Sequence, residues 1–313
     1  MTRVGIPLAI TLQVISSFLF ASGATLQHLG VKSTFDPNAT ASSNRLTLMG
    51  MLKLLLIPKW LLGLLCVFAG AGLHLWALTM APVAVVQPVG ILAVPWSVIL
   101  ASRIHGHRIS YQVWRAVLVT VVGVVGFTVF SSLFANGKKQ FGFMPITWSF
   151  VAVCVICATL SFFAAKKTAP WAKAVMWSSV GAIFYGLASG MMKAAMNMVQ
   201  SGEFHLLHPT TLAVIGYMLA CYGLGAWMIQ QGYASGPAEI TVGTMTTVDP
   251  FVAVLFGLLV LGEGAGMGIG PVAGMVISGA VAVYGVVMLS KDHPEAVEER
   301  EKAAKASDMI VKE

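Results

Sequence analysis

Nine apolar runs, each about long enough to cross a bilayer, constrain this chain more than any other feature of its sequence. A transmembrane helix needs about 20 apolar residues. Hydrophobic residues make up 57% of the chain and charged residues only 10%, whereas a soluble domain carries about 25% charged residues. The sequence therefore predicts an all-α polytopic membrane protein with nine transmembrane helices. The runs cover about 5–29, 60–80, 83–102, 114–134, 144–164, 174–199, 210–230, 238–261 and 267–289.

The segment 46–57 leaves the number of spans open between nine and ten. It is apolar, but it is only 12 residues long, it carries Lys53, and it stops at Pro58 and Lys59. This length fits either a shortened tenth span or a helix that lies in the membrane interface. We expect the first run, 5–29, to be retained as a span, because it is too long for the apolar core of a typical signal peptide.

One proline-framed segment occurs twice in the chain. Pro82 and Pro95 are 13 residues apart, and Pro237 and Pro250 repeat this spacing 155 residues later. A proline inside a spanning helix removes a hydrogen bond and bends the helix. Paired segments of this kind in the two halves of a membrane chain are typical of transporters built from repeats. We therefore predict that these four prolines, together with Pro88, act as conformational hinges.

The two copies are five spans apart, and this odd number makes them run in opposite directions. The sequence thus predicts two inverted repeats, which would support alternating access by rocking of one half against the other. The predicted domains are a first transmembrane repeat at 1–136, a second at 137–290 and a charged cytoplasmic tail at 291–313.

The net charge of +7 lies mainly in short loops on one side of the predicted spans. By the positive-inside rule, that side is cytoplasmic and includes the C-terminus. The charge is therefore a topology signal, and we expect no nucleic-acid partner. The predicted location is an inner or plasma membrane, and the side of the N-terminus depends on whether 46–57 spans.

Asp249 is the first candidate for a functional site. It lies near the middle of its run and shares a helical face with Glu239 and Thr246. A carboxylate in a span costs about 3 kcal/mol, so it usually faces a cavity or a partner. We predict that Asp249 binds a substrate or cation, or carries a proton. The alternative is a structural role, in which it pairs with a lysine or with backbone groups freed by Pro250.

Three further intramembrane residues are candidates for binding a substrate or ion. Lys193 could bind an anionic group or neutralise Asp249, although helical counting separates the two by about 12 Å in depth; the alternative is snorkelling to the outer face. His74 and Gln87 could hydrogen-bond a substrate or a neighbouring helix. Glu263, at an outer helix end, is either functional or an interfacial carboxylate.

Several other patterns favour structural roles. Cys154 and Cys157 have C-x-x-C spacing but lie in mid-span, so we interpret them as packing residues and not as a metal or redox pair. His105 and His107 fit a solvated turn better than a metal site. The chain has no G-x-x-x-x-G-K-[ST] loop, so it carries no ATPase of its own.

The second proline segment resembles the drug/metabolite transporter superfamily of the EamA type. The resemblance rests on Gln231-Gly-Tyr-Ala-Ser-Gly-Pro-Ala, on Thr-Val-Asp249-Pro250-Phe-Val-Ala-Val-Leu-Phe-Gly and on Leu261-Gly262-Glu263. The first copy, from Ala77-Leu-Thr-Met-Ala-Pro82 onward, resembles the first repeat of that family. The resemblance covers about 60–290 and implies two inverted bundles that move small solutes without ATP.

Two departures from that family pattern matter. The family usually has Gly-Glu-Arg where this chain reads Gly106-His107-Arg108, and the family's second span corresponds here to the short segment 46–57. The segment Leu55-Leu-Ile-Pro-Lys-Trp-Leu-Leu-Gly63, which leads into the run 60–80, is similar to the nine-span magnesium-transporter-like (NIPA) branch. The resemblance does not supply the substrate.

The sequence as a whole predicts a secondary transporter of a small metabolite, most simply an exporter coupled to an ion or proton gradient. A divalent-cation permease of the Mg²⁺ type and a non-transporting membrane scaffold are the alternatives. No catalytic cluster is seen, so we expect no enzyme and no cofactor. Expected partners are a small-molecule or ion substrate and the lipid bilayer. Gly270 and Gly274 form a GxxxG pattern that fits either a homodimer face or packing within the bundle.

Overall fold

The computed structural model describes residues 5–35, 46–80, 86, 89–106, 109–134, 142–166, 170–202, 204–262 and 267–292, and all the regular secondary structure in these ranges is helical. Ten helices lie in these ranges, and eight of them are long and apolar enough to cross a membrane. The prediction of an all-α polytopic membrane protein is therefore confirmed. The helices are α1 (Gly5–Lys32), α2 (Leu48–Leu54), α3 (Pro58–Met80), α5 (Ala93–His105), α6 (Tyr111–Phe134), α7 (Phe143–Lys166), α8 (Pro170–Ser201), α9 (Pro209–Ser235), α10 (Ala238–Leu259) and α11 (Ile269–Asp292).

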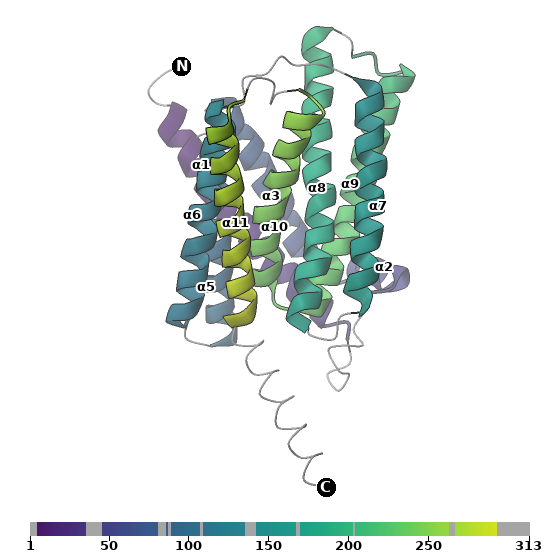
Figure 1. Cartoon of the computed structure of the whole chain (residues 1–313). Helices are drawn as coiled ribbons and strands as arrows, with labels where there is room; N and C mark the ends of the chain where they lie inside the picture. The colour runs from purple at the N-terminus through teal and green to yellow at the C-terminus, as the bar shows by residue number, and fades with distance from the viewer. Residues whose placement is uncertain are drawn as a thin grey trace.

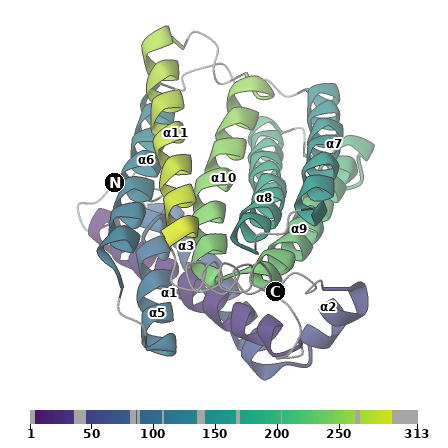
Figure 2. The same cartoon turned by 60° about the horizontal axis from the view of Figure 1, so that its bottom comes forward.

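The long helices stand side by side in one bundle, and successive helices run in opposite directions (Figures 1 and 2). We call the end where α1 finishes and α3 begins the lower end, and the opposite end, where α8 finishes and α9 begins, the upper end. Basic side chains mark the lower end, as the charge pattern of the loops predicts. The described basic residues there are Lys32, Lys53, Lys59, Arg103, Arg115, Lys166, Lys173 and Lys291.

Two described helices are too short to span. Helix α2 has 7 residues, or about 10 Å at 1.5 Å per residue, so it supplies no tenth span. Helix α5 has 13 residues, whereas the sequence predicts one continuous run over 83–102. A turn at Ile91 and Leu92 interrupts that run. The hydrogen bonds from Leu92 N to Val89 O and from Val94 N to Ile91 O are tight three-residue bonds that end one helical segment and start α5.

Glycines allow the closest approaches between helices. A Cβ atom at Gly23 of α1 would lie 2.8 Å from the carbonyl oxygen of Gly63 on α3, and one at Gly181 of α8 would lie 2.9 Å from that of Gly225 on α9. Gly274 of the GxxxG pattern packs against the ring of Phe130 on α6. Close helix contacts of this kind stabilise membrane bundles by packing alone. Gly274 of the GxxxG pattern therefore takes part in helix packing inside the bundle.

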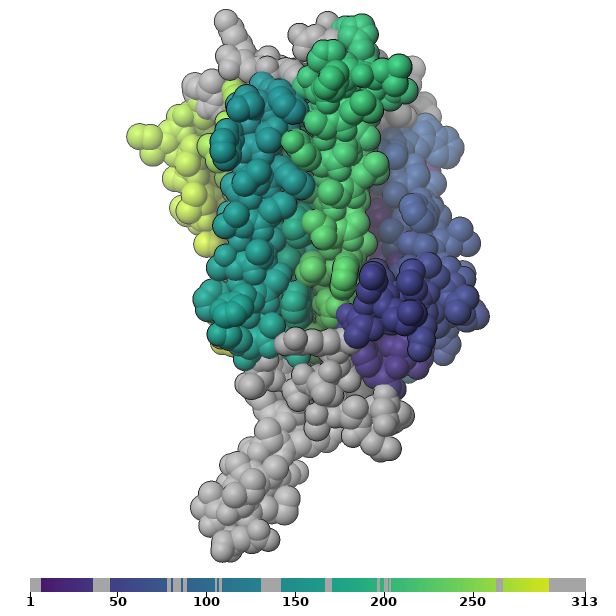
Figure 3. Space-filling view, turned by 90° about the vertical axis from the view of Figure 1, so that its right-hand side faces the viewer, coloured from purple at the N-terminus to yellow at the C-terminus, as the bar shows by residue number. Residues whose placement is uncertain are grey.

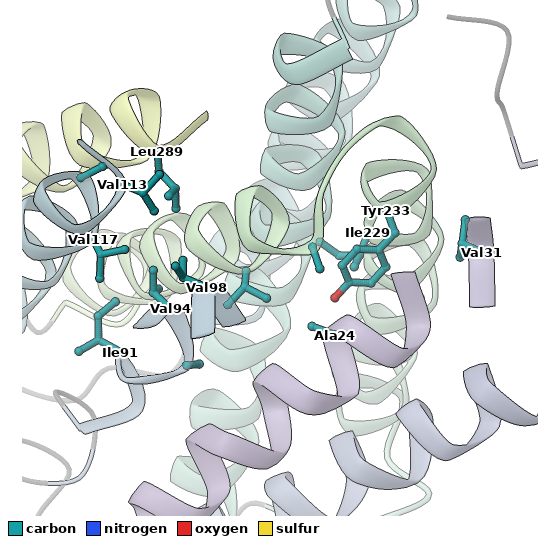
Figure 4. Packing of buried hydrophobic residues seen from close by; sticks show 14 of the residues in the cluster. Ala24, Val31, Ile91, Val94, Val98, Val113, Val117, Ile229, Tyr233 and Leu289 are labelled. Atoms are coloured by element: carbon teal, nitrogen blue, oxygen red, sulfur yellow. The ribbon is translucent and has the colours of Figure 1, made fainter. Parts of the chain in front are cut away.

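The apolar cores differ between the two ends. One large cluster occupies the lower half and joins both halves of the chain, because it takes side chains from α1, α5 and α6 as well as from α9, α10 and α11 (Figure 4). Toward the upper end the cores separate. One cluster joins α7, α8, α9 and α10, and a second small one joins the start of α1 with the end of α3. The two halves of the chain thus share their large apolar core in the lower half, and toward the upper end they still meet where α6 packs on α11, at Phe130 and Gly274.

Candidate functional site

Helix α10 carries Asp249 into the middle of the bundle. Pro237 precedes the helix as its N-cap with φ of −58°, which suits a helix start, and α10 then continues through Pro250 to Leu259. Asp249 is the twelfth of 22 residues, so about 16 Å of helix separates it from the lower end of α10. Glu239 lies in the first turn and is buried. Asp249 thus lies near the middle of α10, as the sequence predicts.

One hydroxyl group bonds to the Asp249 carboxylate, and two more lie within its electrostatic range. The Ser189 side chain of α8 hydrogen-bonds to it, and the charge of Asp249 acts on the hydroxyls of Tyr185 on α8 and Tyr222 on α9. The two tyrosine rings lie 6.0 Å apart between centroids. We call Asp249, Ser189, Tyr185 and Tyr222 the carboxylate cluster. It combines one negative charge with hydroxyl groups that can donate or accept hydrogen bonds.

The carboxylate cluster keeps some exposed surface, although Asp249 lies near the middle of α10. Ser189 is exposed, Asp249 is partly exposed, and Tyr222 keeps 39% of its surface. The same three helices, α8, α9 and α10, also carry part of the apolar cluster that joins α7 to α10. An accessible carboxylate with hydroxyl neighbours is suited to binding a cation or exchanging a proton.

The backbone around Asp249 is arranged for close contact. A Cβ atom at Gly186 of α8 would lie 2.5 Å from the Asp249 carbonyl oxygen, so only glycine lets α8 approach α10 here. Pro250 has no N–H, so the carbonyl of Thr246 lacks its usual helical donor. The Thr246 hydroxyl bonds back to the carbonyls of Val242 at 2.8 Å and Gly243 at 3.2 Å. Thr246 therefore lies on the same face of α10 as Asp249, but its hydroxyl group hydrogen-bonds to carbonyl groups of α10 itself.

Lys193 lies above the carboxylate cluster at about the depth that the sequence suggests. It is exposed on α8, seven residues above Gly186, which contacts Asp249. Seven residues span about 10 Å along the helix axis, close to the expected 12 Å between Lys193 and Asp249. Gly186 and Gly190 of α8 lie against Asp249 and Phe256 of α10, so the two helices run parallel with α8 extending further down.

His74 contacts a neighbouring helix. Its Nδ1 lies 2.7 Å from the Gln13 side-chain oxygen on α1, and the Gln13 amide in turn would lie 3.0 Å from a Cβ atom at Gly90. This contact joins α1 and α3 toward the upper end and favours the structural alternative for His74. The predicted residues Gln87, Pro82, Pro88 and Glu263 lie outside the described residues.

The sequence analysis missed a buried polar belt at the lower end. The Gln230 amide of α9 donates to the Gln27 side-chain oxygen on α1 at 2.8 Å, and Trp60 Nε1 of α3 donates to the Gln230 oxygen at 3.0 Å. Nearby, His28 Nδ1 lies 3.0 Å from the Tyr233 carbonyl oxygen. We call Gln27, His28, Trp60, Gln230 and Tyr233 the lower belt. It ties the first half of the chain to α9, and uncharged polar residues within apolar runs were its only sequence signal.

The cysteines are all free thiols. Cys157 is buried, and its Sγ lies 3.9 Å from the Val180 carbonyl oxygen on α8. Cys157 also belongs to the core cluster of α7 to α10. Within the described ranges no group of three or more His, Cys, Asp or Glu side chains is placed to hold a metal ion. Cys157 therefore contributes to the packing of α7 against α8 in this structure.

Two relatives place the chain among known proteins. An uncharacterized protein of Corynebacterium glutamicum is 26% identical over 261 residues, which cover 82% of this chain and 85% of that protein. A protein of Arabidopsis thaliana named probable magnesium transporter NIPA9 is 26% identical over 216 residues, which cover 65% of this chain and 61% of the plant protein. No family model matches the chain, and no solved structure matches it significantly.

These similarities agree with the helical architecture. The described part of this chain contains eight long apolar helices, as expected for a multi-pass membrane protein, and the chain is similar to a plant protein that is named as a transporter. The part of the predicted resemblance that points to the NIPA branch is supported by the plant relative. Membership of the drug/metabolite transporter superfamily stays a prediction, since no family model matches.

Proposed function

We propose that this protein is a membrane transporter that binds a cation at Asp249. The observation that supports this most directly is the accessible carboxylate in the middle of the bundle, beside Ser189 and within the electrostatic range of two tyrosine hydroxyls. An ionisable group in a span is expensive, and it is usually kept where it serves a substrate or ion path. The hydroxyls supply hydrogen-bonding groups without neutralising the charge.

The arrangement of the two proline copies supports alternating access. A shared apolar core and the lower belt join the two halves of the chain at the lower end, and α6 and α11 also pack together toward the upper end, where Gly274 lies against Phe130. The helices that carry the two proline copies, α5 and α10, run in opposite directions, which supports two inverted repeats at 1–136 and 137–290.

A hydrated divalent cation such as Mg²⁺ is the first candidate substrate. The plant relative is named as a magnesium transporter. Mg²⁺ gives up its water reluctantly and is commonly held by one or two carboxylates while it keeps several waters. One carboxylate with hydroxyl neighbours fits such an ion, because the hydroxyls can hydrogen-bond to its bound water.

A secondary transporter of a small metabolite is the second candidate. The observation that favours it is the single carboxylate of the cluster, which suits a proton or another monovalent coupling ion as well as a metal. Asp249 would then couple an ion gradient to solute movement, and export is the direction we propose. The basic residues at the lower end support a cytoplasmic C-terminus in an inner or plasma membrane.

The test is ion flux into proteoliposomes that contain the purified chain. The variant is Asp249→Asn, and the matched control is Asp292→Asn, which makes the same chemical change at the lower end of α11. A fluorescent Mg²⁺ indicator and a pH indicator are enclosed in parallel vesicle batches. We expect Asp249→Asn to lower the flux at least about tenfold, which corresponds to a loss of about 1.4 kcal/mol of binding or barrier lowering.

The outcomes separate the candidates. Mg²⁺ flux that requires Asp249 supports the divalent-cation transporter. Proton flux that requires Asp249 and depends on an added metabolite mixture supports the coupled transporter. Equal flux through Asp249→Asn and the wild type would refute a cation site at Asp249. If no flux exceeds that of empty vesicles with either indicator, the scaffold alternative replaces both.

A further inference from the structure

We infer that α2 and the start of α3 form a binding surface for anionic phospholipids of the leaflet at the lower end. The surface consists of five apolar side chains and two lysines, and we call it the α2 surface. Its members are Leu48, Met49, Lys53, Leu52, Leu55, Leu56 and Lys59. This inference needs only the membrane location of the chain and is independent of the proposed transport activity.

The α2 helix is fixed to the bundle from one side and open on the other. Leu54 is fully buried and Leu46, just before the helix, is 5% exposed, and both belong to the core cluster of the lower half. The five apolar members of the α2 surface are between 47% and 81% exposed. Figure 3 shows α2 as a dark blue lobe on the side of the bundle near its lower end. Acyl chains are the environment that such side chains favour at this depth.

The lysines give the α2 surface its charge. Lys53 and Lys59 are both exposed, and residues 46–60 contain no acidic residue. Lys59 is the second residue of the long helix α3, so it lies at the boundary of the membrane, where phosphate headgroups are found. A lysine near an anionic leaflet contributes about 1 kcal/mol of attraction. Apolar contacts toward the membrane interior and lysines at the boundary together match one phospholipid with a negative headgroup.

The α2 surface is also tied to the lower end of α9. The Gln231 side chain of α9 accepts a hydrogen bond from Leu46 N at 3.1 Å and donates one to Leu46 O at 2.6 Å. This paired amide contact holds the chain entering α2 against α9, five residues before the link at Gly236 to α10. A lipid on α2 would therefore favour the conformation in which the lower end of α9 is packed.

The test is native mass spectrometry of the purified full-length chain in detergent with phosphatidylglycerol and phosphatidylcholine added at equal concentration. The variant is Lys53→Gln with Lys59→Gln. The matched control is Arg103→Gln with Lys166→Gln, which removes the same charge from two other exposed positions of the lower end. We expect the variant to bind phosphatidylglycerol about 25-fold more weakly, roughly fivefold for each lysine, and the control to bind like the wild type.

Two further arms identify the ligand. Leu52→Ser with Leu56→Ser should weaken phosphatidylglycerol binding by at least about tenfold, because two exposed leucines lose their contact with acyl chains. Soluble glycerol 3-phosphate should not displace the lipid. Equal losses in the two charge variants would overturn the inference, and so would displacement by glycerol 3-phosphate, which would indicate a site for free phosphate esters.

Discussion

The two proline-framed segments have the same spacing and different structures. In the second copy, α10 runs without interruption from Ala238 past Pro250 to Leu259. In the first copy, a turn at Ile91 and Leu92 precedes α5, so Pro95 is the third residue of a new helix. A proline in the first turn costs nothing, because the N–H it lacks has no helical partner there, whereas Pro250 leaves a carbonyl without its donor.

The chemistry of the two copies differs as well. The residue that corresponds to Asp249 at the 155-residue offset is Val94, which is fully buried in the core of the lower half. Thr246 corresponds likewise to Ile91. One copy therefore carries the accessible carboxylate, and the other supplies apolar packing in the same place. We therefore propose that the first copy is a rigid packing element and the second a chemically active one, and the following experiments test that division.

The largest effect is expected when the interior proline is replaced. Pro250→Ala gives α10 the missing N–H and can stabilise the straight helix by as much as about 3 kcal/mol. If bending of α10 accompanies transport, the flux through proteoliposomes should fall about tenfold or more, since 1.4 kcal/mol is already a factor of ten. The matched variant is Pro95→Ala, which should keep the flux within about twofold because its position in the first turn needs no N–H.

Equal flux in the two proline variants would show that the copies are mechanically equivalent. Thermal unfolding in detergent is measured alongside the flux. A variant with lower flux but unchanged or higher stability separates a loss of bending from a loss of folding.

The second prediction concerns the close approach of α8 to α10. Gly186→Ala would place a Cβ atom 2.5 Å from the Asp249 carbonyl oxygen, and the forced shift should destabilise the protein by about 1–3 kcal/mol. The matched control is Gly72→Ala on α3, where nothing lies within 4 Å of the added atom. Thermal unfolding should show a lower midpoint for Gly186→Ala alone. Similar midpoints for both variants would mean that α8 moves aside easily and that this contact does not position Asp249.

Most of the helices could be predicted from the sequence, because a span of about 20 apolar residues is a property of one local segment. The break before α5 could not be predicted in this way. The same proline spacing occurs in a continuous helix, α10, and in a segment that a turn at Ile91 and Leu92 interrupts. The position of Asp249 was predictable from charge alone. Ser189 and Tyr222 were not, because they are neutral side chains on two other helices and only packing brings them to the carboxylate.

The lower belt illustrates the same limit. Gln230 and Gln231 are adjacent in the sequence, but their partners are Gln27 and Trp60 for the first and the backbone of Leu46 for the second. Contacts over such sequence separations depend on the assembled bundle. The polar character of these residues was visible in the apolar run, whereas their role in joining the halves was not.

The smallest expected effect tests whether the lower belt closes the bundle. Gln230→Leu removes the acceptor of Trp60 Nε1 and the donor to Gln27, and it should destabilise the protein by about 1 kcal/mol, as hydrogen bonds between membrane helices typically do. A double-mutant cycle with Trp60→Phe isolates the contact, and its coupling energy should be of similar size. In the same vesicles, Gln230→Leu should raise the accessibility of a cysteine introduced at Ala24 to a thiol reagent added from the lower side, since Ala24 is buried in the shared core. Additive effects in the cycle with unchanged labelling would show that the apolar core closes this end without the belt. A coupling energy of about 1 kcal/mol together with increased labelling at position 24 would instead show that the hydrogen bonds of the lower belt hold the two halves of the chain together at this end.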